Sequence, residues 1–208
     1  MKIQGISTRT LKRLPYYFNY LVNEYRELDG YVSSTTIANA LGLNEVQVRK
    51  DIASTCNVRG VPKRGFPVKE LVMGLKECLG HNSVNDAILV GTGNLGRALL
   101  QYKGFEQYGL NIVEAFDLNE FELEGRKIWG IEKLPSFIKE NGIKIAVITV
   151  PASSAQIVCD LLTKNGILAV WNFAPVPLSV PKGVLVQNEN MASSLAVLSN
   201  HLKARLMS

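Results

Sequence analysis

Residues 86–102 read DAILVGTGNLGRALLQY, and this stretch decides the fold of the larger part of the chain. A short apolar run, suited to a strand buried on both faces of a parallel sheet, leads into Gly91, Gly93 and Gly96, and a helical pattern follows. In a G-x-G-x-x-G turn the first glycine permits the sharp bend, the second lets the backbone approach a pyrophosphate, and the third lets helix and strand pack closely. The expected cofactor residues of this turn are Gly91, Thr92, Gly93, Asn94, Leu95 and Gly96.

The segment after the turn contains the acid that a dinucleotide site needs. Residues 111–117, NIVEAFD, predict a second strand, and the strand ends in Asp117, 21 positions after Gly96. That spacing is near the one expected for the carboxylate that binds the adenosine ribose. An acid there favours NAD over NADP, because it would repel a 2′-phosphate. Arg126 and Lys127 are close enough in sequence to leave NADP open.

Strand and helix patterns alternate through the rest of this half. Strand patterns at 142–151, 167–175 and 183–189 surround a helical pattern at 153–166. This order predicts an α/β domain of Rossmann type, with a parallel sheet and helices on both faces. Ligands bind beyond the carboxyl ends of such strands. The residues expected there, flanking the nicotinamide, are Thr149, Pro151, Asn172, Phe173 and Ala174.

The first eighty residues follow a different, helical pattern. Apolar residues recur at helical spacing in a first segment at roughly 9–28, and shorter helices are predicted at 34–41 and 45–56. Gly42 makes the turn between the two short helices, with Ser33 or Ser34 and Asn44 as caps. The side chains expected to face inward are Leu14, Tyr17, Phe18, Leu21, Tyr25, Ile37, Ala40, Leu41, Val46, Val48 and Ile52.

Two helices joined by a glycine turn are the helix-turn-helix arrangement, whose second helix enters the major groove of DNA. Residues 57–68, NVRGVPKRGFPV, predict a two-stranded basic wing, and residues 69–80 a closing helix, which makes this a winged-helix domain. The residues expected to contact double-stranded DNA are Gln47, Arg49, Lys50, Ser54, Arg59, Lys63 and Arg64. The alternative is a helical packing module with a solvated basic loop.

The charge distribution agrees with a nucleic-acid partner for the first part alone. The chain has 23 Lys+Arg and 18 Asp+Glu, a net charge of +5, and residues 1–80 hold 12 and 7 of them, so they carry the whole excess. Cys56, Cys78 and Cys159 are far apart and lack CxxC spacing, which argues against a disulfide framework or a zinc site and for the cytoplasm. The sequence contains no run of eighteen apolar residues, so no membrane span is predicted.

The last segment, 189–208, is predicted to be an amphipathic helix whose apolar side packs on another surface. Its apolar row of Met191, Leu195, Leu198, Leu202 and Leu206 needs an apolar surface on its own domain or on another subunit. A hydride-transferring enzyme would need a substrate pocket and an acid or base. The two histidines, His81 and His201, lie in an expected linker and in this helix, so we expect the nucleotide to be sensed and not used.

Taken together, these motifs resemble the Rex family of redox-sensing bacterial repressors over nearly the full length. The likeness rests on ALGL, VQVRKD and KRG in the first part, GTGNLGRALLQYKGF, TVPASSAQ and NFAPVPLSVPKGV in the second, and the terminal VLSNHL. It implies a winged-helix domain at 1–80, a Rossmann NAD(H) domain at 85–188, and a helix at 189–208 swapped across a homodimer. It further implies a palindromic operator that is released when NADH replaces NAD⁺, with Tyr102 and Phe105 near the nicotinamide.

The chain departs from the family pattern in the DNA-binding part and near the tail. Family members commonly continue RKDLSYFG into a GKRGVGY wing, whereas here the stretch reads RKDIASTCNVRGVPKRGFPV. Asn19 and Asn190 stand where members tend to have an arginine and an acid that couple ligand to DNA. Two other functions remain open from sequence: a regulator of this build that binds coenzyme A, and a small NAD(P)-dependent oxidoreductase.

Overall fold

The structure is a computed structural model, and it describes residues 6–80 and 85–207. These residues form two compact units. The first takes in the N-terminal segment and residues 107–109, and the second takes in residues 85–106 and the chain from Leu110 onward. The expected linker that contains His81 lies outside the described residues. The division near residue 85 is where the helical pattern of the sequence gives way to the strand pattern.

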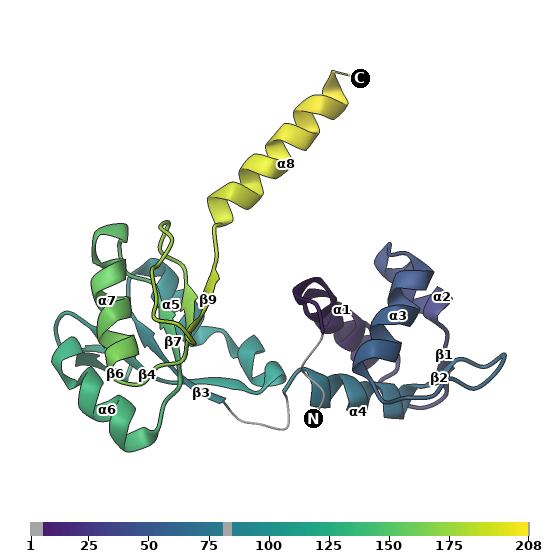
Figure 1. Ribbon diagram of the computed structural model, residues 1–208, viewed down its shortest axis with the longest axis horizontal. Coiled ribbons are helices and arrows are strands. Elements are labelled where there is room, and N and C mark those ends of the chain that lie inside the picture. The colour runs from purple at the N-terminus through teal and green to yellow at the C-terminus, as the bar shows by residue number, and fades with distance from the viewer. Residues whose placement is uncertain (1–5, 81–84, 208) are drawn as a thin grey trace. The chain divides into compact units, whose positions relative to one another are not determined.

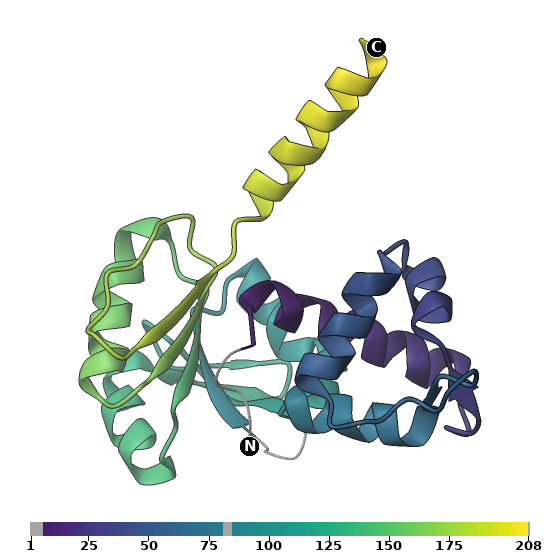
Figure 2. The same cartoon turned by 45° about the vertical axis from the view of Figure 1, so that its right-hand side comes forward.

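Within residues 6–80 the first unit has the helices α1 (Thr8–Glu24), α2 (Ser34–Leu41), α3 (Glu45–Thr55) and α4 (Val68–Cys78). Figure 2 shows them gathered round one core, from purple α1 to blue-green α4. Ser33 Oγ accepts a hydrogen bond from Thr36 N and caps α2, and Asn44 Oδ1 does the same for α3. Gly42, at φ +63°, ends α2 in the left-handed conformation that glycine adopts without strain. The helix-turn-helix prediction is confirmed, with α1 ending earlier than expected.

The core of this unit contains most of the expected side chains. Leu14, Tyr17, Phe18 and Leu21 of α1 are buried, and so are Val48 and Ile52 of α3. Two expectations were wrong. Val46 is 44% exposed because it lies two positions from Val48, on nearly the opposite side of α3. On α2 it is Ala38 that is buried, whereas Ala40, two positions further along the helix, is exposed.

The predicted two-stranded wing is much shorter in the structure. Within residues 57–68 the segment pairs with itself only at the isolated bridge between Val61 and Gly65. The returning segment β2 (Phe66–Pro67) instead pairs with β1 (Tyr31–Val32), in a stretch that the sequence presented only as a helix break. A Cβ on Gly65 would collide with the Val32 carbonyl oxygen, so this glycine allows the close approach. Prolines at 62 and 67 remove N–H donors that a longer ladder would need.

The second unit is built on a seven-stranded sheet, of which β3, β4, β6, β7 and β9 are labelled in Figure 1. The strands lie in the order β5-β6-β4-β3-β7-β8-β9. All neighbours pair in parallel except β5, which runs antiparallel to β6 at one edge. The strand bounds are β3 (Asn85–Val90), β4 (Leu110–Asp117), β5 (Phe121–Leu123), β6 (Arg126–Gly130), β7 (Ile145–Ile148), β8 (Ala169–Asn172) and β9 (Leu185–Asn188). The Rossmann-type prediction is confirmed.

The two faces of this sheet are covered unequally. On one face α6 (Leu134–Asn141) and α7 (Ala152–Lys164) bury a large cluster that includes Ile88, Phe116 and Ile148. On the other face α5 (Asn94–Gln101) and the 3-10 turn η1 (Lys103–Tyr108) cover a smaller cluster around Leu89 and Val147. A second 3-10 turn, η2 (Ile131–Lys133), precedes α6. The last helix, α8 (Met191–Leu206), has no buried residue.

Candidate nucleotide site and DNA interface

The glycine turn joins β3 to α5, and its glycines serve different needs. Gly91 has a φ of +98°, and a Cβ there would lie 2.9 Å from the carbonyl carbon of Thr149. A Cβ on Gly96 would collide with the Gly91 carbonyl oxygen, whereas one on Gly93 would meet nothing within 4 Å. The fold itself therefore requires the first and third glycines. The open space beside Gly93 leaves the backbone accessible to a ligand.

The N-terminus of α5 faces the same turn. Asn94 is its first residue, and Gly93, at the cap position, has no side chain that could satisfy the first N–H groups. Uncapped N–H groups at a helix start carry the positive end of the helix dipole and donate readily to phosphate oxygens. The Arg97 side chain steadies the turn through its Nε, which donates to the Thr92 carbonyl at 3.0 Å. Both features of the turn fit a pyrophosphate.

Asp117 ends β4 and is hydrogen-bonded to the glycine turn. Its Oδ2 accepts the backbone N–H of Thr92 at 2.7 Å and the Thr92 hydroxyl at 2.5 Å, and its Oδ1 accepts Leu118 N at 2.8 Å. Burial raises the pKa of Asp117, but these donors outweigh it and hold the pKa below its usual value. The group is therefore a carboxylate that keeps acceptor capacity for a sugar hydroxyl.

Arg126 and Lys127, the two cations for which the sequence left NADP possible, form contacts away from Asp117. Arg126 Nη2 donates to the carbonyls of Ile112 and Val113, in the first half of β4, and Asp117 is at the end of that strand. Lys127 is 2.7 Å from Glu120, and its ammonium lies 4.0 Å from the centre of the Trp129 ring. Neither of these two cations is engaged with Asp117.

A cavity of about 510 Å³ connects these features, a volume in the usual range for small-molecule sites. Among the predicted cofactor residues it is lined by Gly91, Thr92, Gly93, Asp117, Thr149 and Pro151. Sequence reasoning missed the remaining walls, which are Val90, Leu118, Ile131, Val150, Ser154 and Val158. Val90, Leu118 and Val150 are direct neighbours in sequence of predicted residues, and that adjacency was the available signal. The other residues converge only through the tertiary fold.

Three of the predicted strand-end residues, Thr149, Asn172 and Ala174, form hydrogen bonds within the fold. Thr149 Oγ1 donates to the Gly91 carbonyl oxygen at 2.5 Å and so holds the glycine turn. Asn172 is fully buried, and its amide donates to the carbonyls of Ala174 and Val176 and to Asn188 Oδ1. Its own Oδ1 accepts Ala174 N at 3.0 Å. Asn172 and Ala174 thus shape the strand end, and a cofactor contact for them stays a prediction.

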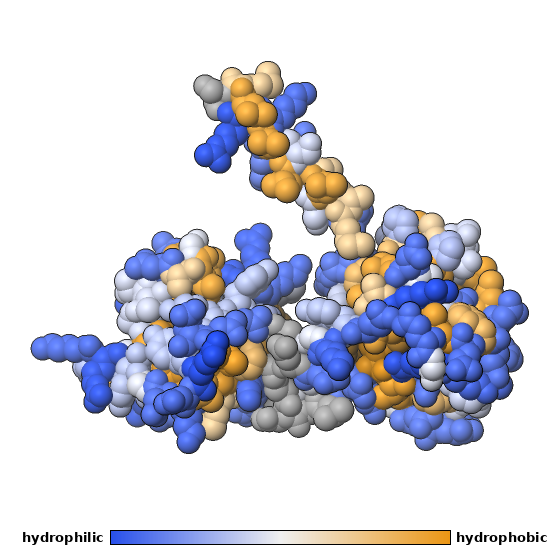
Figure 3. Space-filling model, turned by 180° about the vertical axis from the view of Figure 1, so that it is seen from behind, coloured by the Kyte–Doolittle hydropathy of each residue, from blue (hydrophilic) through white to orange (hydrophobic). Residues whose placement is uncertain are grey.

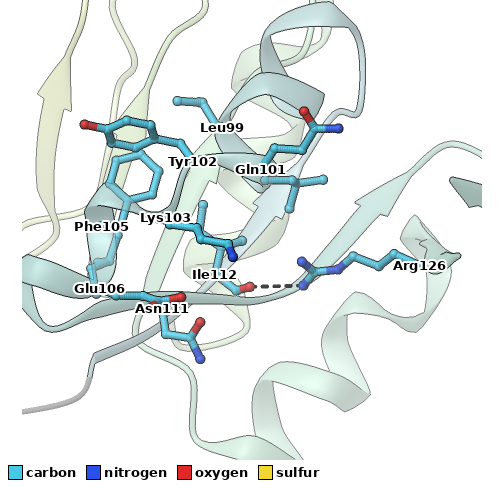
Figure 4. A pocket seen from close by; sticks show the side chains of 11 residues that line it. Leu99, Gln101, Tyr102, Lys103, Phe105, Glu106, Asn111, Ile112 and Arg126 are labelled. Atoms are coloured by element: carbon cyan, nitrogen blue, oxygen red, sulfur yellow. Dashed lines mark hydrogen bonds between the residues drawn. The ribbon is translucent and has the colours of Figure 1, made fainter. Parts of the chain in front are cut away.

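Four aromatic rings follow one another on the α5 face of the sheet. Tyr102 contacts Phe105 with ring centroids 5.0 Å apart, Phe105 contacts Trp171 at 5.5 Å, and Trp171 contacts Phe173 at 4.5 Å. Tyr102 and Phe105 line a separate hollow of about 340 Å³ above Ile112, shown in Figure 4. Tyr102 and Phe105 are therefore linked to Phe173 through Trp171, a residue that was not predicted. They do not line the cavity at the glycine turn.

The residues predicted to contact DNA are exposed in the first unit. They are Gln47, Arg49, Lys50 and Ser54 on α3, and Arg59, Lys63 and Arg64 in the wing. Lys63 has φ +61°, a left-handed conformation that is strained for a lysine, at the wing tip. The Arg64 guanidinium lies 4.0 Å from the centre of the Tyr31 ring, and Gln47 donates to Asp51. The wing and α3 together give a cationic surface that fits a polyanion.

Two family models match parts of the chain. The model described as "Putative DNA-binding protein N-terminus" matches residues 5–53, and the model described as "CoA binding domain" matches residues 82–176. Each match covers less than half of the 208 residues. The two matches follow the same order as the helical unit and the sheet unit.

Relatives of known name match nearly the whole chain. The redox-sensing transcriptional repressor Rex of Treponema denticola is 37% identical over 193 residues, which is 91% of each chain. Rex of Carboxydothermus hydrogenoformans is 40% identical over 210 residues, covering 98% of this chain and 99% of that protein.

Solved structures match as fully. RSP, a Rex-family repressor, in complex with beta-NAD⁺ and operator DNA aligns with a TM-score of 0.89 and 30% identity, over 97% of this chain and 94% of that chain. RSP in complex with beta-NADH aligns with a TM-score of 0.84 and 31% identity, over 98% and 97%.

Proposed function

The chain belongs to the Rex family of redox-sensing transcriptional repressors, and from this premise we propose how its residues divide the work. Residues 1–80 bind operator DNA, residues 85–188 bind NAD(H), and residues 189–208 join two copies. Its relatives are transcriptional repressors, and the chain is accordingly a regulator and not an enzyme. The observation that carries the proposal is the open space at Gly93 beside the carboxylate of Asp117, in a chain whose cationic excess lies entirely in the other unit.

The residues at the glycine turn fit a dinucleotide. The N–H groups at the start of α5 would donate to the pyrophosphate, and Asp117 would accept a ribose hydroxyl, while Leu118 and Ile131 supply apolar walls beside it. Thr92 fixes the carboxylate with two hydrogen bonds. The similar repressor RSP forms complexes with NAD⁺ and with NADH, which supports NAD(H) over coenzyme A.

DNA binding is assigned to α3 and the wing. Arg49, Lys50, Arg59, Lys63 and Arg64 are exposed and would neutralise phosphates, so the affinity for DNA should fall steeply with salt. Gln47 and Ser54 lie on the exposed part of α3 that would face base edges in the major groove. Bound to chromosomal DNA, the protein would work in the cytoplasm, where its three free thiols stay reduced.

Dimerisation is assigned to α8 because two apolar surfaces of the second unit lack cover. The row of leucines on α8 is exposed, with Leu195 at 67%, and Figure 3 shows it in orange along the helix. On the sheet, Leu185 of β9, which pairs with Ala169 of β8, is 72% exposed. A second copy that exchanges α8 would cover both surfaces, and its two α3 helices would read a palindromic site.

The redox response requires that NADH and NAD⁺ bind two states of the dimer with different affinity. Adenosine and pyrophosphate are common to both forms, so the nicotinamide end must discriminate. A buried apolar pocket would accept the neutral reduced ring better than the cationic oxidised one, because burying an unpaired charge costs free energy. A 100-fold effect on DNA affinity corresponds to about 2.7 kcal/mol of coupling. NADH would then favour the state whose DNA-binding units are misplaced for the operator.

The experiment that tests the ligand is competition binding to the purified full-length protein. Titration calorimetry with NADH, NAD⁺, NADPH and coenzyme A is expected to give the tightest binding for NADH, with NADPH and coenzyme A failing to displace it. A preference for coenzyme A would support the regulator with an exchanged ligand that the sequence left open. Steady loss of absorbance at 340 nm with NADH and carbonyl compounds would support the oxidoreductase. Either result would overturn the proposal.

A further inference from the structure

A single buried acid lies at the centre of a hydrogen-bond cluster beneath the recognition helix α3. Asp51 is 1% exposed and accepts hydrogen bonds from four side chains. Its Oδ1 accepts Thr10 Oγ1 at 3.2 Å, Arg13 Nη2 at 2.9 Å and Gln47 Nε2 at 2.9 Å. Its Oδ2 accepts Arg13 Nε and Tyr17 OH, both at 2.7 Å. The carboxylate is therefore saturated, as a buried charge must be.

Three of these donors belong to α1, so the cluster sets how α3 lies against α1. Thr10, Arg13 and Tyr17 follow one another at helical spacing on one side of α1. The two-pronged contact from Arg13 fixes the carboxylate in direction as well as position. Burial raises the pKa of Asp51, but Arg13, Tyr17 and Gln47 outweigh it, and the pKa stays below its usual value. Asp51 is thus held as an ion in one orientation.

The fourth donor, Gln47, lies one helical turn before Asp51 and is exposed. An ionised carboxylate can only accept hydrogen bonds, so the Gln47 amide must turn its NH₂ group toward Asp51 and its Oε1 away. Within the described chain the amide has no other hydrogen-bond partner. One N–H and the Oε1 therefore remain for a ligand, in a fixed direction. A glutamine amide reads adenine with this pair of groups, because Oε1 accepts from N6 and Nε2 donates to N7.

We propose that Asp51 is a positioning residue for sequence readout: it presets the Gln47 amide to recognise one A·T pair in each half of the operator. This deepens the proposed DNA-binding function and rests on it. The cluster around Asp51 is assembled from residues far apart in the chain, so the preset direction of Gln47 is a property of the folded unit and not of α3 alone. Gln47 is the specificity-determining residue, and Arg13 acts on it only through Asp51.

The test is selection of DNA by the full-length protein from a duplex library with randomised half-sites, sequenced to give a base preference at each position. Gln47→Ala is expected to relax one A·T position by roughly 10- to 100-fold while leaving the other positions ranked as before. Asp51→Asn is expected to relax the same position. The double variant should show no further loss there, because both changes remove the same interaction.

A matched control is Ser34→Ala, which removes a hydrogen bond from α2 to Glu45 at the start of α3 without touching the cluster. Its base preferences should equal those of the wild type. Should Asp51→Asn fail to fold, Arg13→Lys keeps the charge but cannot form the two-pronged contact, and it should relax the same A·T position partly.

Two outcomes would overturn the inference. One is a uniform loss of affinity in Asp51→Asn or Arg13→Lys with unchanged base preferences, which would make the cluster merely structural. The other is a wild-type profile in Gln47→Ala. A wild-type chain that enriches no sequence at all would instead overturn the proposed DNA-binding function.

Discussion

At the scale of single residues, Gly93 separates the needs of the fold from those of the ligand. Its φ of −61° suits any residue, and a Cβ there meets open space. Gly93→Ala should therefore fold normally and gain up to about 1 kcal/mol of stability. NADH binding should weaken at least about tenfold, because the methyl group occupies the space of the pyrophosphate. Calorimetry on the variant checks this.

The matched comparison is Gly96→Ala, in which the added Cβ collides with the Gly91 carbonyl oxygen. That variant should lose thermal stability even without nucleotide. If Gly93→Ala binds NADH as tightly as the wild type, the pyrophosphate does not lie at this turn.

Asp117 makes a prediction about cofactor choice. Asp117→Ala removes a charged acceptor for the ribose and should weaken NADH binding by roughly 10- to 100-fold. It should also narrow the gap between NADH and NADPH, because the repulsion of a 2′-phosphate goes with the carboxylate. Glu122→Ala, an equal change of charge at the exposed edge strand β5, should leave both affinities unchanged. Equal NADH binding in wild type and Asp117→Ala would show that the ribose lies elsewhere.

At the scale of elements, local signals located some parts of the fold and tertiary contacts decided others. Ser33, Gly42 and Asn44 mark the ends of α2 and α3 in the sequence itself, so the helix-turn-helix was predictable. The wing was predicted too long because the partner of β2 is β1, in a segment that looks like a helix break.

The β5–β6 hairpin and α6 were missed although signals existed. Gly125, with φ +77°, turns the hairpin, and α6 has a proline in its first turn and is capped by Gly142. The candidate site could likewise be predicted only in part from local sequence signals. Its glycines and Asp117 follow a spacing rule, whereas the partners of Asn172 and Tyr102 depend on packing across the sheet.

The recognition helix α3 carries a prediction of its own. Arg49→Ala combined with Lys50→Ala should abolish DNA complexes in gel shifts while leaving the thermal melting temperature unchanged, since both side chains are exposed. The slope of log affinity against log salt should become shallower by about 0.9 for each phosphate that the variant no longer neutralises. Lys144→Ala with Lys164→Ala, the same charge change on exposed positions of the other unit, is the control. Normal DNA binding by the α3 variant would remove this helix from the interface.

The terminal helix α8 gives a prediction about dimerisation. Leu195→Asp with Leu202→Asp puts two charges into the exposed leucine row and should convert the dimer to monomers in sedimentation analysis. Ser193→Asp with Asn200→Asp adds the same charge on the opposite side of α8 and should leave the dimer intact. The Asn190 side chain caps α8 at Ser193 N, so the helix start that departs from the family pattern is still well formed. A dimer that survives the leucine changes would assign association to another surface.

At the scale of the whole molecule, the function is a coupling between two units that the sequence already separates by charge and by pattern. The unit with the glycine turn is neutral overall, and the unit with α3 holds the net charge of +5. Neither unit alone can sense and repress. In the proposed dimer, the response to NADH comes from a change in how the paired units are held. Nucleotide affinity and DNA affinity then change each other by the same factor.

The most direct measurement is the affinity of the purified full-length protein for a duplex selected from a randomised library, taken at one fixed salt concentration without nucleotide, with NAD⁺ and with NADH. The account predicts that NADH weakens DNA binding by about 100-fold relative to NAD⁺, equivalent to roughly 2.7 kcal/mol of coupling. It also predicts that Gly93→Ala binds the duplex normally and needs at least about tenfold more NADH for the same loss of DNA binding. The same affinity in all three conditions would contradict the account.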